Sequence, residues 1–240
     1  MYKGLAKYYD LIYSWKDYRG EAEKVRALIA KYKQSDGNSL LEVACGTGKH
    51  LQYLRDGFQY TGLDLNDGML KIARKRFPST RFEKGNMINF NLGKKFDIII
   101  CLFSSIGYVK TRDNLRKTLD NFSRHLKPGG ICIIEPWLTP ASYKVGKAHM
   151  TVYDGNDIKI ARLNVSKAKG GISILEMHHL IAEKNKKIRY IVTREELGLF
   201  DTQETLKLME GAGLDAKFLR KNEFDRGRGI LVGVRRQFPD

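Results

Sequence analysis

Short apolar runs alternate with helical patterns through the first two thirds of the chain. Predicted strands cover 39–44, 58–63, 80–84, 96–102 and 130–135, and predicted helices cover 49–55, about 66–77 and 114–126. Such alternation is typical of βαβ units, which build a parallel sheet with helices packed on its faces. The sequence therefore predicts an α/β fold, whose ligand site lies beyond the carboxyl ends of the strands.

The pattern changes between about Ala148 and Val192, where apolar and polar residues alternate between turn sequences. This change predicts three or four antiparallel strands joined by hairpins. A helix near 202–212 and strands near 216–221 and 229–234 return to the first pattern. We therefore expect one domain formed by 1–147 and 193–240, and an inserted antiparallel β subdomain at 148–192 that covers the substrate site.

Composition excludes several classes of protein. No apolar run approaches the length of a membrane span, and the polar, tyrosine-rich N-terminus lacks a secretory signal, so we expect a cytoplasmic protein that does not insert into membranes. Cys45, Cys101 and Cys132 are widely spaced, which predicts reduced, buried thiols. His178 and His179 are adjacent in a predicted strand and should face opposite ways. No metal site is predicted.

A net charge of +16 raises the hypothesis of a polyanionic partner. The basic residues, however, are spread along the chain in short groups, as on solvated faces and turns. Nucleic-acid binding is therefore disfavoured, but it stays open as an alternative.

The first predicted strand ends in a glycine turn, Glu42 to Gly48, in which Gly46 and Gly48 let the backbone approach a ligand. Leu51 occupies the third glycine position of a dinucleotide fingerprint, so a nicotinamide site fits poorly. Asp64 ends the second strand, where a carboxylate can accept hydrogen bonds from ribose hydroxyls, although it could also only cap a helix. After the third strand, Asn86 and Met87 could hold the edge and face of an adenine.

These segments together resemble the class I S-adenosylmethionine (SAM) dependent methyltransferases. The resemblance covers residues 38–137 and is carried by LLEVACGTGKHL, GLDL, GNM, FDIIICLFSSIGY and LKPGGICIIEPW. It implies a Rossmann-like, seven-stranded sheet and SAM as the cofactor.

One branch is more similar still, the N,N-dimethyltransferases that act on nucleotide-linked amino sugars. That resemblance extends over nearly the whole chain and includes the N-terminal tyrosines, FSSIG, EPW and Gly227-Arg228-Gly229. It implies cofactor contacts at Tyr9, Glu42, Ala44, Gly46, Gly48, Asp64, Leu65, Met69, Asn86, Met87 and Leu102. It also implies substrate contacts at Tyr2, Tyr18, Ser105, Trp137 and Arg228. Some members carry histidine at the position of Tyr108, which leaves the hydroxyls of Tyr2 and Tyr108 as the catalytic groups expected near the amine.

The predicted reaction is N-methylation of a small-molecule amine. A guanidinium such as that of Arg228 matches phosphate oxygens, which suits a diphosphate carrier, although Arg228 could also be a solvated arginine. Alternatives are an N-methyltransferase for an amino acid or another small amine, an RNA or protein methyltransferase, and a SAM-binding regulatory module. Relatives form dimers, so a homodimer is expected.

Overall fold

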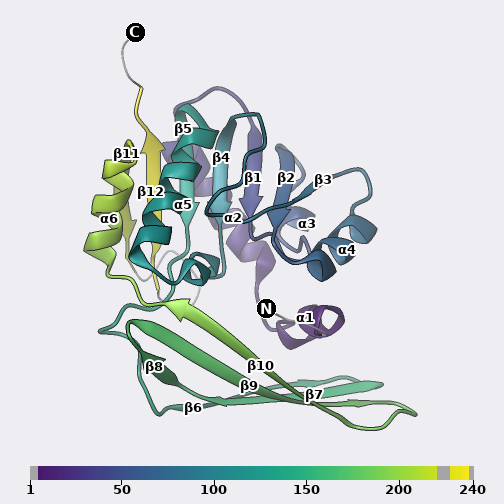
Figure 1. Cartoon of the computed structure of the whole chain (residues 1–240). Coiled ribbons are helices and arrows are strands. Elements are labelled where there is room, and N and C mark those ends of the chain that lie inside the picture. Colours follow the sequence, from purple (N-terminus) through teal and green to yellow (C-terminus); the bar gives the residue numbers. More distant parts are fainter. Residues whose placement is uncertain (1–4, 221–227, 238–240) are drawn as a thin grey trace.

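The computed structural model describes residues 5–220 and 228–237 and contains two sheets (Figure 1). The strands of the larger sheet are β1 (Ser39–Val43), β2 (Gln59–Asp64), β3 (Arg81–Lys84), β4 (Phe96–Cys101), β5 (Leu126–Ile134), β11 (Leu214–Leu219) and β12 (Ile230–Arg235). The helices are α1 (Ala6–Ile12), α2 (Tyr18–Tyr32), α3 (Leu51–Leu54), α4 (Asp67–Arg76), the 3-10 helix η1 (Ser105–Val109), α5 (Arg112–His125) and α6 (Thr202–Gly211).

The larger sheet has seven strands in the order β11-β12-β5-β4-β1-β2-β3, which confirms the predicted α/β class. The order reverses between β1 and β4, and the first five strands are parallel. Only β12 runs against its neighbours β5 and β11 among these strands. All parallel strands therefore present their carboxyl ends at one edge, as the sequence pattern required.

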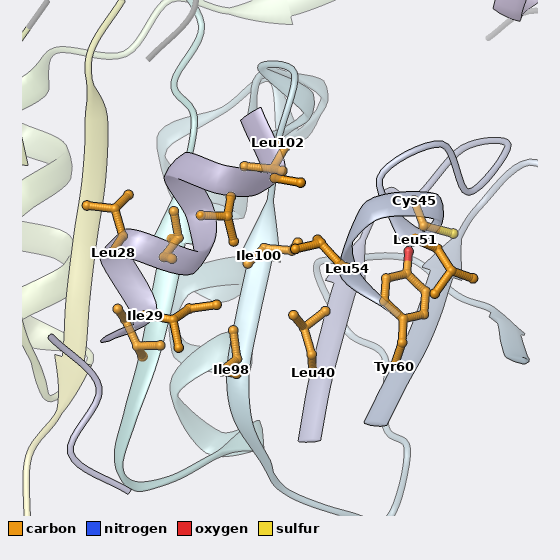
Figure 2. Close-up of a cluster of buried hydrophobic side chains, with 14 of the residues drawn as sticks. Leu28, Ile29, Leu40, Cys45, Leu51, Leu54, Tyr60, Ile98, Ile100 and Leu102 are labelled. Atoms are coloured by element: carbon orange, nitrogen blue, oxygen red, sulfur yellow. The ribbon is translucent and has the colours of Figure 1, made fainter. Parts of the chain in front are cut away.

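Helices cover both faces of this sheet, which explains the continuous apolar runs of the central strands. Every residue of β4 is buried. On one face, Leu28 and Ile29 of α2 pack against Leu40, Ile98 and Ile100 (Figure 2). On the other face, α5 and α6 bury their apolar sides against the same strands. The sheet edge that carries the site is thus held by two separate cores.

The smaller sheet has five antiparallel strands, where the sequence predicted three or four. They are β6 (Ala148–Asp154), β7 (Ile158–Val165), β8 (Lys167–Lys169), β9 (Ile172–Glu183) and β10 (Arg189–Gly198). The main path is β10-β9-β7-β6, and β8 pairs with β9. Strand β10 continues past the expected boundary at Val192 to Gly198, because its pairing with β9 is unbroken to that residue.

This second sheet lies across the carboxyl ends of the parallel strands, with α1 beside it (Figure 1). A third buried cluster joins them: Tyr8 and Ile12 of α1, Met69 of α4, and Ile160 and Ile181 of the sheet. The N-terminal helices α1 and α2 were not predicted from the sequence. In the described part of the chain, no helix is long and apolar enough to cross a membrane.

Candidate active site

A cavity of about 840 Å³ lies between the carboxyl ends of the parallel strands and the inner face of the second sheet. Its walls come from segments far apart in the sequence: the exits of β1, β2, β3, β4 and β5, helix α1, and strands β6, β7, β9 and β10. The predicted site residues that line it are Tyr9, Ala44, Gly46, Asp64, Leu65, Met69, Asn86, Met87, Ser105, Tyr108, Trp137 and Arg228.

The β1 exit forms a tight turn that brings backbone to the cavity. Ala44 and Gly46 both adopt left-handed conformations, with φ of 59° and 56°. No described atom lies within 4 Å of the place where a side chain on Gly46 would begin. The turn therefore exposes backbone to a ligand.

Asp64 closes β2 opposite this turn and is only 5% exposed. Its Oδ2 accepts from the Gly46 amide at 2.8 Å, and its Oδ1 accepts from the Asn66 amide at 2.7 Å. Each carboxylate oxygen has a second lone pair, so Asp64 can still accept two hydrogen bonds from a ligand. Burial raises the pKa of Asp64, although the hydrogen bonds from Asn66 and Gly46 oppose that rise. The cap of α4 is Asn66, whose side chain accepts from Gly68 and Met69, so Asp64 does more than cap a helix.

Four predicted residues are not brought to the cavity wall. Leu102 is 2% exposed within the core at the end of β4, directly before Phe103, which does line the cavity. Gly48 packs against Phe77 and Phe82. Glu42 and Tyr18 face a buried polar network, and their ligand contacts stay predictions. One further predicted residue, Tyr2, lies outside the described residues.

That network links α2 to the glycine turn through buried charges. His50 places Nε2 at 2.8 Å from Glu21 and Nδ1 at 2.7 Å from Glu42, so each ring nitrogen contacts a buried carboxylate. Lys16 pairs with Glu21, and Tyr60 donates to Glu42. These buried contacts hold Glu42, and with it the end of β1, in place.

The β4 exit is the most unusual backbone of the site. Phe103 and Ser104 are consecutive non-glycine residues with φ of 54° and 58°. Glu135, buried at the end of β5, accepts from the Phe103 amide at 2.7 Å and stabilises this conformation. Backbone strain of this kind concentrates at functional sites.

Arg228 is held against the same group. Its Nη1 donates to Ser104 Oγ at 2.6 Å and lies 3.5 Å from Glu135. Its guanidinium stacks over the Trp137 ring at 4.7 Å. With its side chain only 11% exposed, Arg228 is an ordered cation in the cavity wall and not a solvated arginine.

Aromatic rings enclose the centre of the cavity. Tyr9, Tyr13, Phe103 and Tyr108 all line it, and the Tyr13 and Phe103 rings meet edge to face at 4.9 Å. Burial raises the pKa of Tyr9, with further contributions from neighbouring tyrosines that include Tyr108. Tyr9 therefore keeps its proton and offers a neutral hydroxyl.

The second sheet adds a polar and basic wall that the sequence reasoning missed. Arg162 donates to the Tyr13 hydroxyl at 2.9 Å and stacks on its ring, and His149 pairs with Ser166 at 3.0 Å. Glu195 also lines the cavity and is 4% exposed. The alternation of apolar and polar residues along these strands could have shown which side chains share a face of the sheet. It does not show which face lies toward the cavity.

Together these features define the class of the protein. A parallel sheet with the reversal between β1 and β4, a backbone cradle at Ala44 and Gly46, and a buried carboxylate with free lone pairs form the site of a class I methyltransferase. The residues fit SAM: a carboxylate for ribose hydroxyls, a polar-apolar pair at Asn86 and Met87, and an uncharged aromatic enclosure.

The comparisons with known proteins agree. A family described as a methyltransferase domain matches residues 40–130. The chain is 36% identical to the dTDP-3-amino-3,4,6-trideoxy-alpha-D-glucopyranose N,N-dimethyltransferase of Streptomyces venezuelae, over 95% of this chain and 97% of that protein. The chain belongs to the family of these SAM-dependent sugar N,N-dimethyltransferases.

Solved structures extend the similarity to the fold. The crystal structure of Streptomyces venezuelae DesVI superposes with a TM-score of 0.89 at 35% identity, covering 96% of this chain and 98% of that one. A SAM-bound amino pentose methyltransferase from Micromonospora echinaspora matches with a TM-score of 0.82 at 30% identity, covering 92% of each chain.

Proposed function

We propose that this protein transfers methyl groups from SAM to the amine of a sugar carried on a nucleoside diphosphate. The observation that carries the proposal is the two-sided cavity. One side holds the cofactor-type cradle at Ala44, Gly46 and Asp64, and the other holds the stacked cation Arg228 beside Ser105 and Trp137. The relatives that match over nearly full length are named for such sugars, which supports the same substrate class here.

The cofactor half orients the methyl donor. SAM supplies the methyl group on a positively charged sulfur. Asp64 would accept hydrogen bonds from the ribose hydroxyls of SAM, Asn86 and Met87 would contact its base, and Leu65 and Met69 would flank them. The aromatic rings around the centre of the cavity exclude water, so orientation and desolvation carry most of the catalysis.

The substrate half orients the amine. Arg228 meets the diphosphate, because a planar guanidinium forms paired hydrogen bonds with phosphate oxygens. Glu135 and Trp137 hold that guanidinium in place. The hydroxyls of Tyr2 and Tyr108 are the proposed groups near the amine, and Tyr18 and Ser105 are proposed to contact the sugar or its carrier.

The test is calorimetric titration of the cofactor-loaded protein with a thymidine diphosphate amino sugar and with a short RNA, at moderate and high salt. Saturable binding of the sugar that tolerates salt, followed by methylated product, is expected. Tight RNA binding that collapses with salt, without response to the sugar, would favour the polyanion alternative and overturn the substrate proposal.

A variant of Arg228 distinguishes a sugar-nucleotide substrate from a simpler amine. Arg228→Ala should raise KM for the nucleotide sugar about tenfold to a hundredfold, because a charge-assisted pair is lost. Turnover of a simple amine such as glycine, if the protein accepts it, should not change. Equal losses for both substrates would contradict the proposed role of Arg228.

We propose that the second sheet covers the substrate site. We also propose that its outer face forms the contact of a homodimer. The outer face carries large apolar side chains that are exposed: Val152, Leu163, Val165, Leu180, Tyr190 and Val192. Strand register places all of them on one side of the sheet. Monomers rarely expose a patch of this kind, and a two-fold axis lets one patch cover its own copy.

The three free, buried thiols agree with a reducing compartment, for which we propose the cytoplasm.

A further inference from the structure

Glu195 is an acidic residue in a wall that is otherwise rich in cations. Among the described residues that line the cavity, Lys110, Lys144, Lys147, Arg162, Arg194 and Arg228 are basic. The carboxylates that line it are Asp64, Glu195 and Glu196. Asp64 belongs to the proposed cofactor half, and the Glu196 side chain is 29% exposed, whereas Glu195 is 4% exposed. Glu195 is therefore the buried carboxylate of the substrate half.

The position of Glu195 follows from the alternation of side chains along β10. Glu195 and Leu197 point to the same side of the strand. Leu197 packs against η1: a Cβ added to Gly107 would lie 3.0 Å from the Leu197 Cβ. Tyr108 follows Gly107 on η1 and lines the same cavity. Glu195 thus stands on the wall that faces η1 and Tyr108.

The chemistry of an amine needs such a group. An amino sugar enters largely as its ammonium near neutral pH, and only the free base can attack a methyl group. A buried carboxylate in contact with the substrate attracts the ammonium more strongly than a hydroxyl at the same carbon, because only the ammonium carries a charge opposite to that of the carboxylate. This argument rests on the proposed function.

We propose that Glu195 binds the substrate ammonium and accepts its proton before each methyl transfer. The ammonium passes one proton to the Glu195 carboxylate and becomes the free amine. The nitrogen lone pair then forms the bond to the methyl carbon while the carbon–sulfur bond breaks and leaves its electron pair on sulfur. The protonated Glu195 releases its proton to water at the cavity mouth and is again a carboxylate. The methylated product, itself an ammonium, can then pass a proton to Glu195, so the same group serves a second transfer.

The experiment compares the full-length wild type with Glu195→Gln and with the control Glu176→Gln. Glu176 lies on the neighbouring strand β9, outside the cavity wall, with its side chain 38% exposed. Calorimetry on protein loaded with S-adenosylhomocysteine measures binding of a thymidine diphosphate amino sugar and of its hydroxyl analogue. Initial rates from about pH 6 to 10 give the pH profile of kcat and KM.

We expect the wild type and Glu176→Gln to prefer the amino sugar over the hydroxyl analogue, and Glu195→Gln to lose about tenfold or more of that preference. The kcat of Glu195→Gln should fall about a hundredfold at neutral pH and recover toward high pH, where the substrate arrives as the free base. Glu195→Asp should restore part of the rate. Affinity for S-adenosylhomocysteine should be unchanged, which separates this effect from a folding defect.

Two results would overturn the inference in different ways. A wild type that neither binds nor methylates the amino sugar removes the proposed function and the role of Glu195 with it. A wild type that methylates the amino sugar, beside a Glu195→Gln with the same preference and pH profile, removes the role of Glu195 alone. Should Glu195→Gln fail to fold, Glu195→Asp must show a displaced pH profile, and an unchanged profile overturns the inference.

Discussion

Asp64 shows at the scale of one residue how burial and function oppose each other. Burial raises its pKa, yet two backbone amides keep the carboxylate usable as an acceptor. If Asp64 were protonated, one of its oxygens would carry the proton and act as a hydrogen-bond donor in place of an acceptor. Because we propose that Asp64 accepts hydrogen bonds from the cofactor, we expect affinity for the cofactor to depend on the ionised form of this carboxyl.

Asp64→Asn should weaken SAM binding about tenfold to a hundredfold, because hydrogen bonds to a charged acceptor are replaced by weaker neutral ones. Wild-type affinity should also fall as the pH drops toward the raised pKa of Asp64, whereas the affinity of Asp64→Asn should stay flat over that range. Calorimetric titration at several pH values checks both statements. The exposed neighbour Asp67, changed to Asn, serves as the control and should show wild-type affinity.

Two junctions between elements depend on buried charges. At the first, Asp97 at the start of β4 receives hydrogen bonds from Lys127 at 2.8 Å and from the Ser39 amide and hydroxyl at 3.0 and 2.6 Å. Burial alone would raise the pKa of Asp97, but these donors outweigh it and hold the pKa at about 2. The carboxylate joins β1, β4 and β5 at the amino end of the sheet.

This junction predicts a dependence of stability on pH. The folded-state pKa of Asp97 lies below its unfolded value, so its contribution is complete above about pH 4 and disappears as the pH falls toward 2. Asp97→Asn should lower the free energy of unfolding by about 2 kcal/mol at neutral pH and by much less near pH 2. Urea unfolding across this range measures the difference. If the difference in unfolding free energy between the wild type and Asp97→Asn stays constant with pH, the effect does not have an ionic origin.

At the second junction, His50 lies between Glu21 of α2 and Glu42 of β1. His50→Ala leaves two buried carboxylates without this partner, and removal of one member of a buried charge network costs about 3–5 kcal/mol. Urea unfolding should show a loss of that order. The matched control is Glu23→Gln, which removes an exposed ion pair on the same helix and should cost far less.

The elements that could be predicted from sequence are those whose signal is local. Strand β4 is a continuous apolar run because helices cover both of its faces, and this burial is visible in FDIIIC alone. Helix α1 was missed because its apolar residues pack on the second sheet, a contact that no local period reveals. The predicted helix at 49–55 shrinks to Leu51–Leu54, because the glycine turn extends further than its motif indicated.

The position at the cavity of the residues that we propose for the cofactor could be predicted from the sequence for the same reason. These residues follow strand ends, and the carboxyl ends of parallel strands meet at one edge. The contribution of the second sheet could not be predicted, since Glu195 and Arg162 reach the cavity only through the way that sheet lies across the first. Arg228 was placed by resemblance, and its pairing with Glu135 emerges only when β5 and the start of β12 are adjacent.

At the scale of the whole molecule, the distribution of apolar surface bears on assembly. The outer face of the second sheet exposes six large apolar side chains on four strands, while its inner face lines the cavity. A second copy that covers the outer face would also stiffen the strands that carry Glu195 and Arg162. We therefore expect assembly and activity to be linked.

The double variant Val152→Glu with Leu163→Glu should sediment at the mass of one chain, 27.5 kDa, where the wild type sediments at twice that mass. Four charges in a two-fold contact repel each other and must lose their hydration, which an apolar interface does not offset. Val145→Glu is the control: Val145 is similarly exposed but lies before β6, outside the sheet face, and its variant should remain dimeric. A monomeric wild type at tens of micromolar would contradict the dimer. A monomeric double variant with full wild-type turnover would instead show that the second sheet is rigid enough to form the substrate site without its copy.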